Sequence, residues 1–155
     1  MSYVTVETRV QSLLQGITGT FPVAASVSRG DYRVLDSGEA SLAVLTPGNF
    51  DEGRVGQGGA QIVEREWHVL IDLFRKYLDD GTSWQNFAAD RDAVLQELER
   101  RPTLNSLDGI VGVALSADSD PGEVFDENDN GPFFIWQRIR IQTMERADVT
   151  GGEYG

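Results

Sequence analysis

Cysteine is missing from this chain, and histidine nearly so. Without cysteine there can be no disulfide, no thiolate nucleophile and no cysteine-ligated metal. His68 is the single histidine, which argues against metal or acid–base centres built from several imidazoles. We interpret His68 as a structural residue of a strand. No nucleophile–base pair emerges elsewhere, so we expect no enzymatic activity, no catalytic residue, no cofactor and no metal ion.

Basic residues are also scarce. The chain has 13 lysines and arginines against 25 aspartates and glutamates, which gives a formal net charge of -12. Such a surface does not suit a protein that grips nucleic acid by neutralising its phosphates. An acidic surface could still serve DNA by repelling it.

Long apolar runs are absent as well. None approaches the ~18 residues that a membrane span needs, and the N-terminus lacks the basic and apolar segments of a secretory signal. We therefore expect a soluble, intracellular protein. Its 155 residues suit one domain. A chain of that size can bury roughly 70% of the surface that its unfolded form exposes.

The segment 131–146 is the most informative stretch, because apolar residues alternate along it with the period of a β-strand. One face would carry Phe133, Ile135, Ile139 and Ile141, and the other Phe134, Trp136, Arg138, Arg140 and Met144. Aromatic residues interleaved with arginines suit a face that is half covered by a neighbour. That neighbour could be another part of this chain or another subunit.

Four further segments are expected to form strands. Residues 61–73 alternate over a long stretch, and shorter strands are predicted at 21–27, 40–45 and 110–117. The Pro47-Gly48 pair is expected to end the strand at 40–45.

Two segments show helical spacing of apolar residues. The first covers residues 5–16, and the second begins at Thr82, which with Gln85 fits a capping box, and ends before Pro102. The predicted solvated face of the second helix contains Asp90, Asp92, Glu97 and Glu99.

This order of elements predicts an α+β fold, with one mixed, mostly antiparallel β-sheet and two amphipathic helices packed on it. We expect a single domain over residues 1–155. It would carry a flexible glycine-rich loop at 47–60, an acidic loop at 118–130 and a loose C-terminal tail at 147–155.

The glycine-rich segment suggests a phosphate-binding loop at first sight. Its glycines match neither the P-loop nor the dinucleotide-binding pattern, and a strand follows where a helix is needed. We interpret it as a mobile loop or as the tip of an extended hairpin.

The acidic segment contains part of a calcium-binding pattern. Asp126, Asn128, Asn130 and Gly131 fit the first, third, fifth and sixth places of an EF-hand loop. The twelfth place is Gln137 instead of Glu, and the flanking sequence is β. A solvated acidic hairpin loop is the favoured interpretation. Glu64 and Glu66, which share a strand face, likewise resemble a solvated rim more than a catalytic pair.

The arrangement resembles the tail terminator (tail completion) family of long-tailed bacteriophages, the minor tail proteins that close the tail tube. The resemblance covers nearly the whole chain. It includes the opening helix that ends at Gly16, ASLAVLTPG, EREWHVLIDL, the run DRDAVLQELERRPTLNSLDGIVGV and the closing PFFIWQRIRIQTMER strand. The acidic stretch at 118–130 and the glycine-rich loop look longer than the family's core requires.

The resemblance implies a virion protein that acts at the head-proximal end of the tail after assembly in the host cytoplasm. Six copies would form a ring on the last ring of the major tail-tube protein, stop its polymerisation and present the opposite face to a head-completion (neck) protein. Double-stranded DNA would pass through the ring without specific binding, and no membrane is involved.

A closed ring needs two different contact surfaces on each subunit. Candidate contact residues are Phe50, Arg54, Val55, Phe134, Trp136, Arg138 and Arg140. Acidic candidates to face the channel are Glu64, Glu66, Asp118, Asp120, Glu123, Asp126, Glu127 and Asp129. The alternatives are another head–tail neck or adaptor protein, or a metal-dependent enzyme that uses the acidic residues of 118–130.

Overall fold

The structure is a computed structural model that describes residues 2–55, 62–125 and 132–148. It contains the helices α1 (Tyr3–Gln15) and α2 (Asp80–Glu99) and the short 3-10 helices η1 (Ala24–Ser26) and η2 (Tyr32–Asp36). The strands are β1 (Val27–Arg29), β2 (Ser41–Val55), β3 (Ile62–Lys76), β4 (Ile110–Ala117), β5 (Gly122–Phe125) and β6 (Pro132–Asp148).

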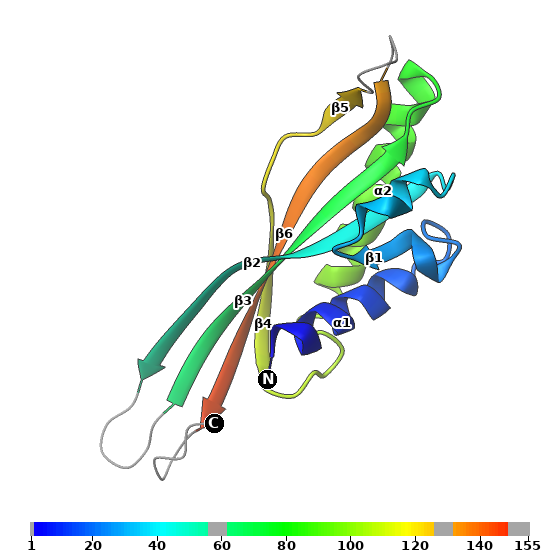
Figure 1. The fold of residues 1–155 in the computed structure, drawn as a ribbon. Coiled ribbons are helices and arrows are strands. Elements are labelled where there is room, and N and C mark those ends of the chain that lie inside the picture. Colours follow the sequence, from blue (N-terminus) through cyan, green and yellow to red (C-terminus); the bar gives the residue numbers. More distant parts are fainter. Residues whose placement is uncertain (1, 56–61, 126–131, 149–155) are drawn as a thin grey trace.

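The strands form one mixed sheet in the order β1-β2-β3-β6-β4, and β5 pairs with the first part of β6. β1 is parallel to β2, and the other described pairs are antiparallel. α1 and α2 lie on the same side of the sheet (Figure 1). The predicted α+β fold is therefore confirmed, and the described part of the predicted strand, residues 132–146, belongs to the long strand β6.

The main core lies between the helices and one face of the sheet. Apolar residues at alternate positions of β2, β3 and β6 point to this side, as the period of a strand requires. The fully buried contributors include Val6, Val10, Leu14, Phe87, Val94, Leu98, Leu45, Ile71, Leu73, Ile139 and Ile141. The apolar stripes predicted for both helices are thus the surfaces that hold them on the sheet.

A smaller cluster covers part of the opposite face. Leu42, Val44, Phe74 and Phe134 are buried there, and Val34 and Leu35 of η2 pack against them together with Trp136. The half-covered face predicted for the last strand is therefore covered, over this part, by the chain's own η2.

The strand predicted at 21–27 is wrong for most of its length. The segment forms η1 and then only three residues of strand. Glutamines of α1 satisfy its carbonyls, since Gln15 Nε2 donates to Ala24 O and Gln11 Nε2 to Val27 O, each at 3.0 Å. Side-chain hydrogen bonds from the helix thus replace those of a longer strand ladder.

The loop predicted at 47–60 is also wrong for residues 47–55, because β2 continues through Pro47 and Gly48 to Val55. β1 pairs with β2 only as far as Leu45, so the missing N–H of Pro47 lies at a sheet edge, where proline is tolerated. Within the described part the hairpin interpretation is the better one. Residues 56–60 lie outside it.

The helix predicted from Thr82 is confirmed, but its cap is different. Asp79 is the N-cap, and its Oδ1 accepts from Thr82 N at 2.8 Å. Asp90 was assigned to the solvated face and is instead buried, because it lies one helical turn from Phe87 and Val94 on the side that faces the sheet.

The acidic loop predicted at 118–130 contains a strand. β5 pairs with β6, with Gly122 opposite Trp136 and Val124 opposite Phe134. The predicted tail at 147–155 begins too early, since β6 runs to Asp148. Residues 126–131 and 149–155 lie outside the described part.

Candidate functional site: the sheet arm and the sheet edges

Three strands extend well beyond the helices. β2 and β3 each have 15 residues and α2 has 20, which corresponds to about 50 Å of strand against about 30 Å of helix. The ends of β2, β3 and β6 therefore project from the helical layer (Figure 1). We call residues 49–55, 62–68 and 142–148 the arm.

A β-bulge marks the start of the arm. Pro47 pairs with Val69, but the next described partner on β2 is Phe50, opposite Trp67, so β2 holds one more residue than β3. Gly48 is needed at this point, because a Cβ on it would lie 2.8 Å from Cβ of His68. The bulge turns Phe50 toward the helix side and Asp51 toward the opposite face.

On the helix side the arm carries aromatic and charged groups. Phe50 is 50% exposed, and its ring lies 4.6 Å from that of Trp67. Further out, Arg65 lies between two carboxylates on neighbouring strands: its Nη1 donates to Glu145 at 2.7 Å and its Nε to Glu52 at 3.2 Å. These three residues form one cross-strand row.

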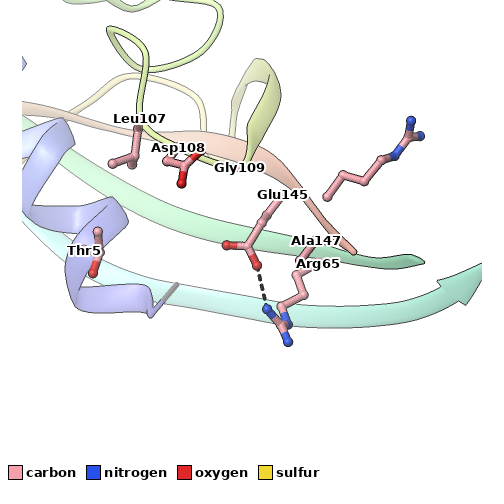
Figure 2. Close-up of a pocket in the computed structure, with 8 residues that line it drawn as sticks. Thr5, Arg65, Leu107, Asp108, Gly109, Glu145 and Ala147 are labelled. Atoms are coloured by element: carbon pink, nitrogen blue, oxygen red, sulfur yellow. Dashed lines mark hydrogen bonds and ion pairs between the residues drawn. The ribbon is translucent and has the colours of Figure 1, made fainter. Parts of the chain in front are cut away.

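A hollow of about 430 Å³ lies beside this row, between the arm, the first turn of α1 and the loop before β4 (Figure 2). Thr5, Leu107 and Asp108 line it together with the ion pair of Arg65 and Glu145. The charges of Arg65 and Glu145 already have partners in each other, so neither is left free to bind a ligand. It suits a contact surface better than a catalytic centre.

On the opposite face, the arm gathers acidic groups around the single histidine. Asp51 lies directly opposite Glu66, and His68 follows Glu66 on the same face of β3. His68 Nε2 lies 3.7 Å from Glu66 Oε2 and 4.0 Å from Asp51 Oδ2. Glu64, one step further out, instead accepts a 2.7 Å hydrogen bond from Arg146.

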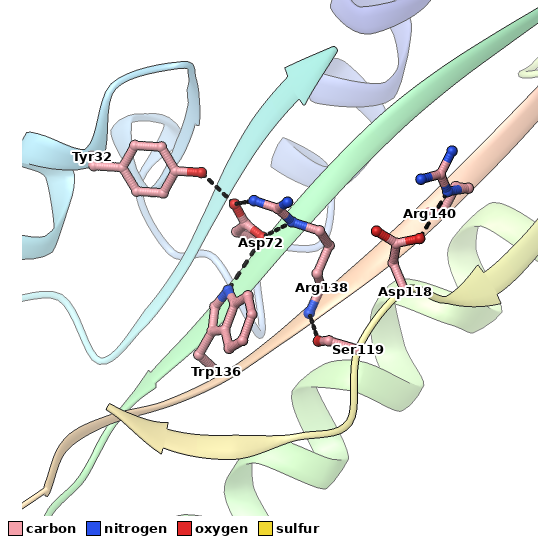
Figure 3. A network of polar contacts seen from close by, with 7 residues as sticks. All are labelled: Tyr32, Asp72, Asp118, Ser119, Trp136, Arg138 and Arg140. Carbon is pink, nitrogen blue, oxygen red and sulfur yellow. Dashed lines mark hydrogen bonds and ion pairs between the residues drawn. The ribbon is translucent and has the colours of Figure 1, made fainter. Parts of the chain in front are cut away.

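Nearer the middle of the sheet this face holds a buried carboxylate with several donors. Asp72 is 1% exposed and accepts hydrogen bonds from Arg138, Trp136 and Tyr32 (Figure 3). Burial alone would raise the pKa of Asp72, but the hydrogen bonds from Arg138 and Tyr32 and the charge of Arg138 outweigh it and lower that pKa. The network therefore fixes η2 onto the sheet.

Asp118 and Ser119 attach the connection between β4 and β5 to strand β6. Arg140 Nε donates to Asp118 Oδ1 at 3.0 Å, and Arg138 N donates to the Ser119 hydroxyl at 2.9 Å (Figure 3). Arg138 and Arg140 thus have partners inside this chain.

A second buried carboxylate lies under α2. Asp90 Oδ2 accepts from the Ser41 hydroxyl at 2.7 Å and from Arg75 Nη1 at 3.2 Å. Burial raises the pKa of Asp90, and the hydrogen bond from Ser41 and the charge of Arg75 only partly offset it. This contact ties α2 to the edge of the sheet and is not open to a ligand.

Besides the outer sides of the short strands β1 and β5, two longer strand edges carry no further strand within the described residues. One is β2 beyond Leu45, and the other is the outer side of β4. β4, with the sequence IVGVALSA, has no charged residue to discourage pairing, and Val111 on it is 51% exposed. Tracing the paired residues across β3 and β6 shows that β4 lies at the same height along the strand direction as residues 45–52 of β2. The two strands run in opposite directions.

The predicted contact residues are not all accessible. Phe50 is exposed, but Phe134 is 4% exposed and packs against the chain's own Phe74, so its apolar side chain needs no partner subunit. Trp136 is partly buried and donates to Asp72. Arg54 and Val55 belong to β2, and their side chains lie outside the described part.

The predicted channel residues fall into two groups. Glu64 and Glu66 lie on the arm, while Asp118, Asp120 and Glu123 lie along the β4–β5 connection and β5. Asp120 is exposed, and Glu123 accepts a 3.4 Å hydrogen bond from Trp84. Asp126, Glu127 and Asp129 lie outside the described residues.

Sequence reasoning missed the grouping of Asp51 with Glu66 and His68. The spacing of Glu66 and His68 already places both on one face of a strand, but Asp51 was assigned to a loop. It also missed the buried Asp72, which the sequence offers only as a lone acid in an apolar run.

No protein-family model and no curated protein matches this chain. No helix among the described residues has the length and apolar character needed to cross a membrane. The fold and the surfaces described above are therefore the basis for any functional conclusion.

Proposed function

We propose that this protein is a tail terminator of a long-tailed bacteriophage, a structural protein that forms a ring on the tail tube and ends its polymerisation. In this proposal the ring also joins the tube to the head-completion protein, and DNA passes through its centre. The observation that carries the proposal is the pair of open strand edges on opposite sides of one sheet. They allow head-to-tail pairing between identical copies.

The geometry of the edges supports a closed ring. β4 and residues 46–52 of β2 lie at the same level and run antiparallel, so β4 of one copy can add to β2 of the next as an antiparallel neighbour. Such a contact joins two different surfaces, and a rotation that closes turns it into a ring. Main-chain hydrogen bonds across this junction would satisfy both edges.

The charge of the chain supports the DNA-conduit part of the proposal. A formal net charge of -12 disfavours retention of phosphates on the inner wall. Glu64 and the acidic residues near β5 are the described candidates for this wall. The alternative is a neck or adaptor protein with a similar order of elements. Its ring would bind a different partner, the capsid portal instead of the end of the tail tube.

The direct test is the mass of the purified protein by native mass spectrometry, with negative-stain images of the protein mixed with tail tubes. A mass of six copies and rings at tube ends are expected. Rings that bind capsid portals and leave tube ends bare would favour the neck protein, and a monomer at high micromolar concentration without tube binding would contradict both.

Val111→Lys tests the proposed junction. A charge on an exposed edge residue of β4 should prevent strand pairing between copies and lower the oligomer mass while leaving the unfolding transition of the subunit unchanged. Gln96→Lys, an exposed position on α2, is the matched control and should assemble normally. Equal assembly of both variants would place the junction elsewhere.

A further inference from the structure

The acidic face of the arm contains a like-charged pair with no basic partner. Asp51 and Glu66 are directly opposite on β2 and β3, a placement that destabilises a sheet when both groups are charged. Neither forms an ion pair with a described lysine or arginine. By contrast, Glu52, Glu64 and Glu145 on the same arm each pair with an arginine.

His68 supplies the third group, and one of its two ring nitrogens, Nε2, has no hydrogen-bond partner among the described residues. The residue is 8% exposed, and Nε2 is buried and lacks a partner among the described residues. That atom points toward the two carboxylates, at 3.7 Å from Glu66 and 4.0 Å from Asp51. A buried polar atom without a partner is costly, so this arrangement calls for a further group between the three side chains.

The backbone of the bulge packs closely against the base of the histidine side chain. A Cβ on Gly48 would lie 2.8 Å from Cβ of His68. The two carboxylates are more accessible, since the Asp51 side chain is 70% exposed and that of Glu66 34%. The site therefore combines one buried nitrogen with two more exposed carboxylates.

We propose that Asp51, Glu66 and His68 bind a divalent transition-metal ion of the Zn²⁺ type. One ligand atom from each residue lies within 4.8 Å of the others. Tetrahedral ligands at zinc distances are separated by about 3.4 Å, so small rotations of the carboxylates complete the site. Two carboxylates and a neutral imidazole neutralise a divalent ion, and the imidazole favours Zn²⁺ over Mg²⁺ or Ca²⁺. Water would occupy the open fourth position.

Arg140 has to change its contact when the metal binds. Its Nη1 lies 3.1 Å from His68 Nδ1, and an arginine can only donate. Ligation through Nε2 leaves the proton of a neutral imidazole on Nδ1, so the guanidinium must turn away from it. Arg140 keeps a carboxylate partner in that state, because its Nε donates to Asp118.

The single histidine makes the test direct. Untagged, ¹⁵N-labelled full-length protein is treated with chelator and titrated with ZnCl₂ while the imidazole nitrogens are followed by NMR and the melting temperature by calorimetry. The ring resonances should shift at one equivalent, the melting temperature should rise by several degrees, and MgCl₂ should do neither. Absence of a ring shift at one equivalent of ZnCl₂ would overturn the proposal.

Conservative variants separate this site from general binding of cations by acidic side chains. Glu66→Gln and Asp51→Asn should each weaken Zn²⁺ binding more than about 100-fold. Glu64→Gln is the matched control, because it removes the same charge from the same strand face at a residue that pairs with Arg146. Equal losses in Glu64→Gln and Glu66→Gln would overturn the site. All three keep side-chain size, so folding is checked by the metal-free melting temperature.

Arg140→Gln tests the role of the ring nitrogen. The glutamine oxygen can accept from Nδ1–H, the arrangement that usually supports a metal-ligating histidine, so Zn²⁺ affinity should be retained or increased. A loss of affinity as large as in Glu66→Gln would overturn Nε2 of His68 as the ligand.

Discussion

The same three strands pass through two regions that are stabilised differently. Under the helices, β2, β3 and β6 bury apolar side chains such as Leu45, Ile71 and Ile139. In the arm, apart from Val63, the described side chains that are buried are polar or charged: His68, Thr143 and Glu145. β3 and β6 therefore change from burial of apolar surface to cross-strand ion pairs in one continuous register, and β2 does so across a single bulge. The covered region contributes stability, and in the proposed ring the arm would provide surface for contacts.

The largest effect should come from truncation in the covered region. Ile71→Ala removes a fully buried side chain between sheet and helices and should lower the free energy of unfolding by about 2–5 kcal/mol. Urea denaturation measures this change. Val111→Ala, at an exposed position of β4, is the control and should change it little. A loss at Ile71 as small as that at Val111 would contradict the assignment of the stability to the covered region.

Asp72→Asn should have the next largest effect, with a dependence on pH. Hydrogen bonds to a buried charged group contribute about 1.5–3 kcal/mol, and Asn retains only part of them. Because the pKa of Asp72 is lowered in the folded state, its stabilising contribution is present above the unfolded pKa of about 4 and is lost as pH falls through the folded pKa.

Unfolding of wild type and Asp72→Asn should therefore differ most near pH 7 and converge in strong acid. Asp36→Asn is the control, because Asp36 is exposed at the end of η2, and it should leave the unfolding transition unchanged. A difference that persists undiminished at pH 2 would show that packing, not the charge of Asp72, is responsible.

Gly48→Ala tests the join between the two regions. The new Cβ would collide with Cβ of His68, and overpacking of this kind costs about 1–3 kcal/mol. Gly53→Ala in the same strand meets no atom within 4 Å and should be neutral or slightly stabilising. Thermal unfolding of the two variants gives the comparison. Equal stability would mean that the backbone relaxes freely at the bulge.

Phe50→Ala should have the smallest effect on the isolated subunit. Its ring is half exposed and contacts Trp67, so its loss should cost less than about 1.5 kcal/mol of folding stability. If the arm is a contact surface, the same change should weaken ring assembly by a larger factor, measured by native mass spectrometry across a dilution series. Unimpaired assembly would remove Phe50 from the proposed interface.

The parts of the fold that sequence predicted well are those with strong periodicity. The alternation predicted for 61–73 and 131–146 and the helical spacing of Val6, Val10 and Leu14 each arise from burial against one surface. The described parts of these segments form β3, β6 and α1. Pro47 and Gly48 misled the prediction, because they end most strands but are tolerated at an open edge with a bulge. Asp90 misled it because its charge suggested solvent exposure, whereas Ser41 and Arg75 supply partners from another part of the chain.

The candidate metal site depended on information that the sequence does not contain. Asp51 and His68 meet only because β2 pairs with β3 in a particular register, and that register follows from the bulge. A pattern of residue types along one strand could suggest Glu66 and His68 but could not supply the third ligand.

The bulge at Gly48 and Asn49 also acts as a phase shift in the alternation of β2. Odd-numbered residues such as Ala43 and Leu45 face the helices before it, and even-numbered residues such as Phe50 do so after it. If the same residues paired without the bulge, Phe50 would lie opposite Glu66 and Asp51 opposite Arg65, so the outer segment would present its two sides reversed. The one extra residue that the bulge accommodates therefore keeps the aromatic side of the arm on the helix face and its acidic side on the opposite face, the arrangement that both proposals require.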